Sequence, residues 1–495
     1  FKRVLAHCQH SRLRMSAVAP IKESTPTMTK AVMCSKSKIC RITTILAIVM
    51  GVLIVGNIIF AIFAFRRNES ALEWPAPSNS HLGVYSTVGI ASDNERCAEI
   101  ASDILLLGGN AVDGAVAAMF CIGIMNPQSA GIGGGHFMTI FNGTSSKCSA
   151  VNARETAPEM ATENMYEDSH EDSATGWRAI AVPGEIHGMW TEFRRFGSGK
   201  VEWADLVRPS IRLLRDGHPT SHALAKALRT KREEILREPT MKRLFVNPAT
   251  KDVYEAGEQV TTRQPLADFL EKLSKASDPI EFFYHGEVAR RIIDEIQEGG
   301  GILTTEDLKN YKSVVYSDEE VVRLALPNGR HICGPPPPSG AAVAMGILNV
   351  MDGFNHDISS FDGTVEFYHR LIEAEKFAYA RRFLLGDAVF VSDALDIARN
   401  LTTSSWAQSV RSRMLERAQP DSYYGGSFQA IADHGTTHIS VIDKEGNAVA
   451  VTTTVNLLFG SLHASRKFGI VWNDQMDDFS APGAANQWGF PPSPA

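Results

Sequence analysis

The longest apolar run of the chain extends from Ile42 to Phe65, and its 24 residues include no charged side chain. A bilayer core needs about 20 consecutive helical residues, and arginines close the run at residue 41 and at residues 66 and 67. A cleavable signal peptide would have a shorter apolar core followed by a small-x-small cleavage site, and we find no such site here. The pattern therefore predicts an uncleaved transmembrane signal anchor at residues 42–65.

Beyond this run, the hydrophobic pattern changes to that of a folded body. Residues 66–88 are rich in Pro, Ser and Asn and predict a linker. From residue 89 onwards, helical spacing and strict alternation predict an ordered series of elements. These are helices at Cys97–Leu107 and Ala111–Ile124, a hairpin of Phe137–Asn142 with Lys147–Ala153, a mainly helical region at 201–311, a β-rich stretch at 314–326, a small-residue helix after Gly334–Gly340, an amphipathic helix at His369–Leu385 and a polar, flexible segment at 399–427.

A second hairpin is predicted around the turn-forming run Asp443–Asn447, with its first strand beginning directly after Gly435. If the residues that flank the turn pair with each other, Thr436 lies opposite Thr454 and Asn456 lies on the same face as Thr454. Threonines favour strands for structural reasons alone. The threonines at this strand end can therefore be read as ordinary strand residues or as part of a polar, reactive cluster.

Charge is distributed unevenly between the two sides of the apolar run. The formal net charge of the 495 residues is −7. Residues 1–41 carry +8, so the remainder carries −15. A basic tail on an acidic body argues against a nucleic-acid partner. Because cytoplasmic flanks of membrane spans are enriched in Lys and Arg, we expect a cytosolic tail at 1–41 and a single-pass type II protein of the plasma membrane with an extracellular body.

The cysteines and sequons agree with an extracellular body. Four of the seven cysteines lie beyond the apolar run, where disulfides persist, and no C-x-x-C spacing suggests zinc: they are Cys97, Cys121, Cys148 and Cys333. Sequons make Asn142 and Asn400 candidate glycosylation sites. A third sequon, at Asn68, stands very close to the predicted span and is the weakest candidate.

A glycine-rich run at 131–135 could suggest a phosphate loop. However, no Lys-Ser/Thr follows it, and the G-x-G-x-x-G spacing is absent. We expect a tight, buried turn at which backbones approach closely.

Several runs of the body resemble the γ-glutamyltransferase family, and they occur in the family's order. They are Asn126–Phe137, Asn152–Pro158, Ala181–Gly188, Gly334–Gly340, Glu373–Ala380, Asp433–Ile442 and Trp472–Phe479. The resemblance covers residues 89–495 and implies an α+β fold, the αββα sandwich of the N-terminal nucleophile hydrolases, with two stacked sheets between helical layers. It also implies self-cleavage between Gly435 and Thr436, which would divide the body into a large-subunit part, 89–435, and a small-subunit part, 436–495.

The same resemblance implies a role for each candidate site residue. Thr436 would become the N-terminal nucleophile, and Thr454 would support its hydroxyl and contribute to substrate binding. Arg154 would hold the α-carboxylate of the γ-glutamyl group, since a guanidinium meets a carboxylate with two hydrogen bonds. The substrate amine would be held by Asn456, Gln475 and Asp478. The cysteines that match the bridged pair of animal family members are Cys97 and Cys121.

The implied chemistry is physically consistent. A threonine hydroxyl needs an adjacent base, and a free α-amino group with a pKa near ~8 can serve as that base. Before cleavage the same nitrogen is an amide, so processing would create the active site. The expected reaction moves the γ-glutamyl group of glutathione or related compounds to water or to an amino acid or dipeptide acceptor. No metal and no organic cofactor is implied.

One departure leaves alternatives open. Family members continue beyond Ala495 with a serine pair that holds the carboxylate and a glycine pair that forms the oxyanion hole. Relative to the family, the sequence is therefore expected to be C-terminally truncated. Besides the enzyme, two hypotheses remain: a catalytically inactive member with a binding or regulatory role, and a related amidase for another acyl group. The pairing of Arg154 with Asp478 argues against the amidase.

Overall fold

The structure, a computed structural model, describes residues 48–57, 83–425 and 435–479. It forms two units, Phe1–Ser80 and His81–Ala495, which we describe separately. In the first unit, residues 48–57 are helical and expose apolar side chains. No helix within the described ranges combines the length and the apolarity needed to cross a membrane. The predicted span at 42–65 extends beyond the described residues at both ends, and the tail at 1–41 and linker residues 66–82 lie outside them.

The second unit is rich in helices, and most of them lie between residues 95 and 310. The mainly helical region predicted at 201–311 is confirmed, because α6 to α13 fall within it. The helices are α2 (Glu95–Leu106), α3 (Ala111–Met125), α4 (Glu171–Ala174), α5 (Glu185–Phe196), α6 (Trp203–Asp216), α7 (His222–Thr230), α8 (Arg232–Arg237), α9 (Pro239–Phe245), α10 (Gln264–Ser274), α11 (Pro279–Tyr284), α12 (Gly286–Glu298), α13 (Thr305–Asn310), α14 (Ala341–Met351), α15 (Phe361–Arg382), α16 (Ala394–Leu401), α17 (Ser404–Arg413) and α18 (Asp421–Tyr424), with short 3-10 helices η1 (Trp177–Ala179), η2 (Pro327–Gly329) and η3 (Gln475–Asp478).

The main sheet is antiparallel, with six strands in the order β1-β9-β10-β2-β3-β6. Its strands are β1 (Gly89–Ser92), β2 (Gly135–Asn142), β3 (Lys147–Ala153), β6 (Val314–Tyr316), β9 (Thr436–Ile442) and β10 (Ala448–Thr454). Both predicted hairpins are confirmed. The predicted register is also confirmed, because Ala448 pairs with Ile442 and Thr454 pairs with Thr436.

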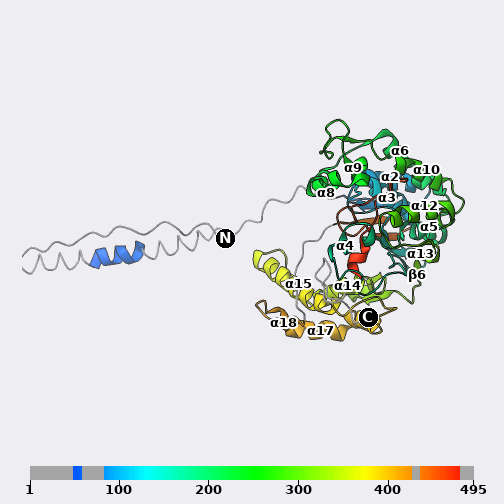
Figure 1. The fold of residues 1–495 in the computed structure, drawn as a ribbon. Coiled ribbons are helices and arrows are strands. Elements are labelled where there is room, and N and C mark those ends of the chain that lie inside the picture. The colour runs from blue at the N-terminus through cyan, green and yellow to red at the C-terminus, as the bar shows by residue number, and fades with distance from the viewer. Residues whose placement is uncertain (1–47, 58–82, 426–434, 480–495) are drawn as a thin grey trace, which may run out of the picture. The chain divides into compact units, whose positions relative to one another are not determined.

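Helix α3 forms the centre of the core beneath this sheet. It is apolar on all sides and almost completely buried, as is typical of a helix without a solvent-facing side. It packs against β9 and β10 and against α2, α5 and α6. Figure 1 shows α2 and α3 beside each other. The strands that carry the predicted reactive residues therefore rest on the most deeply buried helix of the unit.

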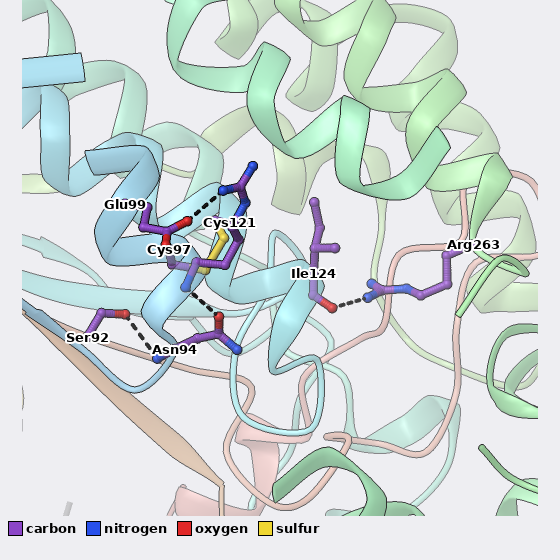
Figure 2. The surroundings of a disulfide bond; sticks show 8 residues. Ser92, Asn94, Cys97, Glu99, Cys121, Ile124 and Arg263 are labelled. Atoms are coloured by element: carbon purple, nitrogen blue, oxygen red, sulfur yellow. Dashed lines mark hydrogen bonds and ion pairs between the residues drawn. A yellow bond between two sulfur atoms is a disulfide. The ribbon is translucent and has the colours of Figure 1, made fainter. Parts of the chain in front are cut away.

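The ends of α2 and α3 are fixed by specific contacts (Figure 2). The expected disulfide between Cys97 and Cys121 joins the two helices. Asn94 caps α2 by accepting a hydrogen bond from the Arg96 backbone N–H at 3.1 Å. Arg263, just before α10, donates to the Ile124 carbonyl at 3.0 Å, which satisfies one of the last carbonyls of α3.

A second disulfide joins Cys148 of β3 to Cys333 of β8 (His331–Gly334). These cysteines are separated by 185 residues, and the sequence analysis assigned no partner to either of them. Strand β8 pairs with β7 (Val322–Ala325), and β4 (His218–Pro219) pairs with β5 (Gln259–Val260). The expected mixture of helices and sheets is confirmed. In the described part of the chain, the six-stranded sheet is accompanied by these two small sheets.

Helices α14 to α18 form a separate hydrophobic cluster with β7, in which Val343, Phe377 and Trp406 are buried. Figure 1 shows α14, α15, α17 and α18 lying together. The predicted helices in 341–382 are confirmed here. The prediction of a flexible polar segment at 399–427 was wrong for the residues that the structure describes, because 404–413 and 421–424 are helical. A few buried apolar side chains, such as Trp406, are enough to hold these helices in the cluster. Their polar side chains remain in contact with solvent.

A buried charged cluster attaches α5 to the sheet. His136 on β2 is fully buried, and its Nδ1 lies 2.7 Å from Glu185 Oε2 while its Nε2 lies 2.9 Å from Glu192 Oε1. Burial lowers the pKa of His136, but the negative charges of Glu192 and Glu185 outweigh this and raise it to about 10. The imidazole is therefore doubly protonated at neutral pH and donates to both carboxylates. We call these three residues the His136 cluster.

The His136 cluster makes stability depend on pH in a defined direction. The folded-state pKa of about 10 lies above the ordinary value of 6.5, so the contribution is complete below about pH 6.5 and is lost as the pH rises through about 10. We expect the free energy of unfolding, measured by denaturant titration, to fall across this window. Glu192→Gln should flatten the fall, whereas Glu287→Gln, on an exposed part of α12, should not. An unchanged slope in Glu192→Gln would contradict this assignment.

Candidate functional site

The site begins at Gly435, the residue before β9. Its φ of +93° lies in the left-handed region, and a Cβ at this position would collide with the Asn456 carbonyl oxygen. A Cβ on Gly134, in the glycine-rich turn, would likewise collide with the Thr454 carbonyl. Only glycine fits at both positions. The tight turn predicted at 131–135 is confirmed, and it supports the end of β10.

The hydroxyls of Thr436 and Thr454 lie 3.2 Å apart, on the same face of the sheet. Thr454 Oγ1 donates to the Gly435 carbonyl at 2.7 Å and accepts from the Asn456 backbone N–H at 2.8 Å. A hydroxyl has a single proton to donate, so the proton between the two threonines belongs to Thr436. Thr454 thus accepts a hydrogen bond from the Thr436 hydroxyl. At the same time it donates to the Gly435 carbonyl and polarises it.

His438 lies on the same face as Thr436 but is engaged elsewhere. Its Nδ1 lies 2.8 Å from Thr452 Oγ1, and its Nε2 lies 3.1 Å from Ser440 Oγ. Burial lowers the pKa of His438 below its ordinary value. With both ring nitrogens in hydrogen bonds to these hydroxyls, His438 is not arranged to act as a base for Thr436.

Asn456 connects the threonine pair to the segment before η3. Its φ of +79° is left-handed, a conformation that asparagine tolerates better than most residues. Its Nδ2 donates to the Asp474 carbonyl at 3.2 Å. The neighbouring Asn473 is fully buried and donates through Nδ2 to the carbonyls of Gly133 and Ala181 at 2.8 and 3.0 Å. This segment is therefore tied both to the threonine pair and to the glycine-rich turn.

Arg154 follows β3 and faces two carboxylates. Its Nε donates to Glu155 Oε2 at 3.1 Å, and its Nη2 lies 3.9 Å from Asp478 Oδ2. The Tyr311 hydroxyl donates to the Arg154 carbonyl at 2.8 Å and fixes the backbone. Burial lowers the pKa of Arg154, but Glu155 and Asp478 raise it above its ordinary value. The side chain is 28 % exposed, so the charged guanidinium can still reach a ligand.

Gln475 and Asp478 face each other across η3. Gln475 Nε2 donates to Asp478 Oδ2, and Gln475 Oε1 is buried without a hydrogen-bond partner among the described residues. Buried polar atoms are normally paired, so this oxygen is an acceptor suited to an incoming donor. Burial also raises the pKa of Asp474 well above its ordinary value, which favours the neutral form of that carboxyl.

The structure therefore brings the predicted site residues into two adjoining groups. Thr436, Thr454, Gly435 and Asn456 form the first through direct hydrogen bonds, and Arg154, Gln475 and Asp478 form the second. The link between them is the contact of Asn456 with the Asp474 carbonyl.

The predicted glycosylation sites lie apart from both groups. Asn142 is exposed at the end of β2, where it pairs with Lys147, and Asn400 is exposed on α16. Within the described residues, no group of three or more His, Cys, Asp or Glu side chains could hold a metal ion.

Sequence reasoning assigned no role to Glu155, Tyr311, Asn473 or Asp474, although each shapes the site. Three of them had a visible signal. Glu155 is adjacent to Arg154, and Asn473 and Asp474 stand in the run that contains Gln475 and Asp478. Tyr311 is separated from Arg154 by 157 residues, and only the fold reveals their contact.

Comparisons with known proteins point in one direction. The sequence profile of the family described as Gamma-glutamyltranspeptidase matches residues 97–495. Scoloptoxin SSD14 of Scolopendra dehaani is 39 % identical over 421 residues, which are 84 % of this chain and 71 % of that protein. Glutathione hydrolase 2 of Arabidopsis thaliana is 36 % identical over 438 residues, 88 % of this chain and 72 % of that protein.

The structural comparison agrees. The crystal structure of Helicobacter pylori gamma-Glutamyltranspeptidase superposes with a TM-score of 0.62 and 29 % identity, covering 69 % of this chain and 96 % of that chain. The N-terminal nucleophile hydrolase fold expected from the sequence is thereby confirmed. The match of the family profile includes every predicted site residue.

Proposed function

Because the chain belongs to the γ-glutamyltranspeptidase family, we propose that it is an enzyme that transfers γ-glutamyl groups through a threonyl ester on Thr436. The donors are glutathione and related γ-glutamyl compounds. The acceptors are water, which makes the reaction a hydrolysis, or amino acids and dipeptides.

The observation that carries this proposal is the pairing of Arg154 with Asp478. Their charged atoms lie 3.9 Å apart, and both side chains are partly exposed. An α-amino acid head group presents a carboxylate and an ammonium on one carbon atom, so it needs a cation and an anion at this kind of separation. Arg154 binds the carboxylate with its fork of donors. Asp478 accepts from the ammonium together with Gln475 Oε1, which has no hydrogen-bond partner in the described part of the chain.

The threonine pair supports the chemical steps. After cleavage, the free amine of Thr436 takes the proton of its own hydroxyl, and Oγ1 attacks the γ-carbonyl carbon of the donor. The C–N bond of the donor then breaks, and the amine returns the proton to the leaving nitrogen. Water or an acceptor amine attacks the resulting ester and frees Oγ1. Before the attack, Thr454 orients the hydroxyl of Thr436 from 3.2 Å.

The same groups support self-cleavage of the precursor. Thr436 Oγ1 attacks the Gly435 carbonyl carbon, its hydroxyl proton passes to the Thr436 nitrogen as the peptide C–N bond breaks, and an ester forms between Gly435 and the Thr436 side chain. Water then hydrolyses this ester and leaves a free Thr436 amine. The hydrogen bond from Thr454 to the Gly435 oxygen, at 2.7 Å, stabilises the negative charge that develops on that oxygen.

We further propose that residues 42–65 anchor the protein in the plasma membrane, with residues 1–41 cytosolic and the body outside. Two observations support this: the uncharged run of 24 residues, and the exposed apolar side chains of the helical residues 48–57. An uncharged apolar segment of this length is favoured in the hydrocarbon core of a bilayer.

The central test is processing at Gly435–Thr436. On a denaturing gel, the natural protein should separate into two fragments, and N-terminal sequencing of the smaller one should give Thr436-Thr437-His438. Thr436→Ala should abolish cleavage and hydrolysis of a γ-glutamyl anilide, because no nucleophile remains. Thr436→Ser should retain both at reduced rates. A natural protein that stays uncut and inert would refute the enzymatic proposal.

Substrate recognition gives an independent prediction. Arg154→Lys should still be processed, since Arg154 does not touch the junction residues. It should raise KM for the γ-glutamyl anilide about a hundredfold, because a point charge replaces the bidentate fork. Arg208→Lys, at an exposed arginine on α6, is the matched control and should match the wild type in KM. An unchanged KM in Arg154→Lys would remove this residue from the binding site.

Anchoring is tested by fractionation. The protein should remain in the membrane pellet after alkaline carbonate extraction and should be released by detergent. Deletion of residues 42–65 behind a cleavable secretion signal should release the body into the medium. Extraction of the natural protein by carbonate alone would contradict the anchor.

A further inference from the structure

The two reactive threonines each have a neighbour that points to the opposite face of the sheet. Side chains alternate along a strand, so Thr437, after Thr436, and Thr453, before Thr454, face α3 and α5. They pair directly with each other across β9 and β10. Both are almost completely buried, with 2 % and 0 % exposure.

Each of these buried threonines donates to a carboxylate. Thr453 Oγ1 donates to Glu185 Oε1 at 2.8 Å, and Thr437 Oγ1 donates to Asp93 Oδ2 at 2.5 Å. Hydrogen bonds to charged acceptors are shorter and stronger than those between neutral groups. Two charged acceptors therefore hold the strand pair from its core face, directly behind the reactive hydroxyls.

The acceptor of Thr453 is itself held rigidly. Glu185 Oε2 bonds His136 Nδ1 at 2.7 Å, and the opposite ring nitrogen bonds Glu192 at 2.9 Å. Glu185 and Glu192 are one heptad apart on α5, on the same side of the helix. His136 in turn pairs with Thr453 in the sheet. The three charged side chains and the threonine thus form a closed connection between β2, β10 and α5.

We propose that Thr453 and Thr437 are positioning residues, which fix the separation and orientation of Thr436 and Thr454 through the carboxylates of Glu185 and Asp93. This inference rests on the proposed function and deepens it. Neither residue touches the substrate, because both point away from the reactive face. Adjacent residues of a strand share a peptide unit, so anchoring Thr453 also fixes the backbone that presents the Thr454 hydroxyl.

The precision required makes this anchoring consequential. In the uncut chain Thr454 serves three partners at once, at 2.7, 2.8 and 3.2 Å, and two of them, Thr436 and the Asn456 N–H, belong to the part that begins at Thr436. A misplacement of about 1 Å can cost roughly a hundredfold in rate. An apolar side chain at position 453 would fill the same space. It would not bond Glu185, so the end of β10 could shift.

The test compares substitutions of similar size at Thr453 in the natural, full-length protein. Thr453→Val keeps the shape and loses the donor, whereas Thr453→Ser keeps the donor. We expect Thr453→Val to slow precursor cleavage and to lower kcat about tenfold or more, with KM within twofold of the wild type. Thr453→Ser should restore kcat to within about threefold. Thr437→Val and Thr437→Ser should follow the same order.

Two controls separate positioning from general destabilisation. Thr139→Val makes the same substitution on the other face of β2 and should leave kcat unchanged. If Thr453→Val fails to fold, Glu192→Gln, which loses a charge on the far side of His136, replaces it. We then expect kcat to fall while KM stays constant at temperatures well below the melting point.

The outcomes distinguish this inference from the proposed function. A wild-type protein that is processed and active, beside a Thr453→Val variant with the same cleavage rate and kcat, would overturn the positioning role and leave the enzymatic proposal intact. A lower melting temperature with an unchanged kcat would overturn it equally. A wild-type protein that is neither cut nor active would refute the proposed function itself.

Discussion

The antiparallel pairing of β9 with β10 is the constraint on which the reactive end of this protein depends. The register sets Thr454 opposite Thr436, and a shift of either strand by one residue would place the two hydroxyls on opposite faces of the sheet. The register is strongly specified because the alternate side chains, among them Ile439, Val441, Val449 and Val451, are buried against the core. Burial of apolar side chains on one face therefore determines the chemistry that is possible on the other.

Under the proposed function, cleavage and catalysis use the same residues, and the geometry of the uncut chain supports this. In the intact chain the nitrogen of Thr436 belongs to a peptide bond and cannot act as a base. His438 does not replace it, since its ring nitrogens bond Thr452 and Ser440. The proton of Thr436 is instead directed to Thr454, whose own proton polarises the Gly435 carbonyl. The arrangement of the Thr436 and Thr454 hydroxyls is thus suited to attack on the Gly435 carbonyl in the uncut chain. After cleavage it is suited to attack on the carbonyl of a substrate.

Charged groups serve different purposes on the two faces of the sheet. On the core face, His136 is paired on both sides by Glu185 and Glu192. Buried charges are tolerated only when they are paired in this way, and the result is a rigid attachment of α5. On the other face, Arg154 and Asp478 are partly exposed and 3.9 Å apart. Because this ion pair is long and partly exposed, a ligand with a negative and a positive group can replace it, with one group bound to Arg154 and the other to Asp478.

The sequence by itself determined the local features and those that a repeated pattern specifies. Turn residues and alternation located both hairpins. The register across the Asp443–Asn447 turn followed once the two flanking residues were assumed to pair, and the structure confirms that pairing. The family motifs identified Thr436, Arg154 and Asp478. Contacts between distant segments could not be derived in this way. Cys148 and Cys333 are 185 residues apart, and His136 meets Glu185 and Glu192 only because β2 and α5 pack together. The helices found between residues 399 and 424 were also missed, because their polar sequence hides a few buried anchors such as Trp406. Periodicity is a local property of the chain, whereas burial and partners depend on which distant elements the fold brings into contact.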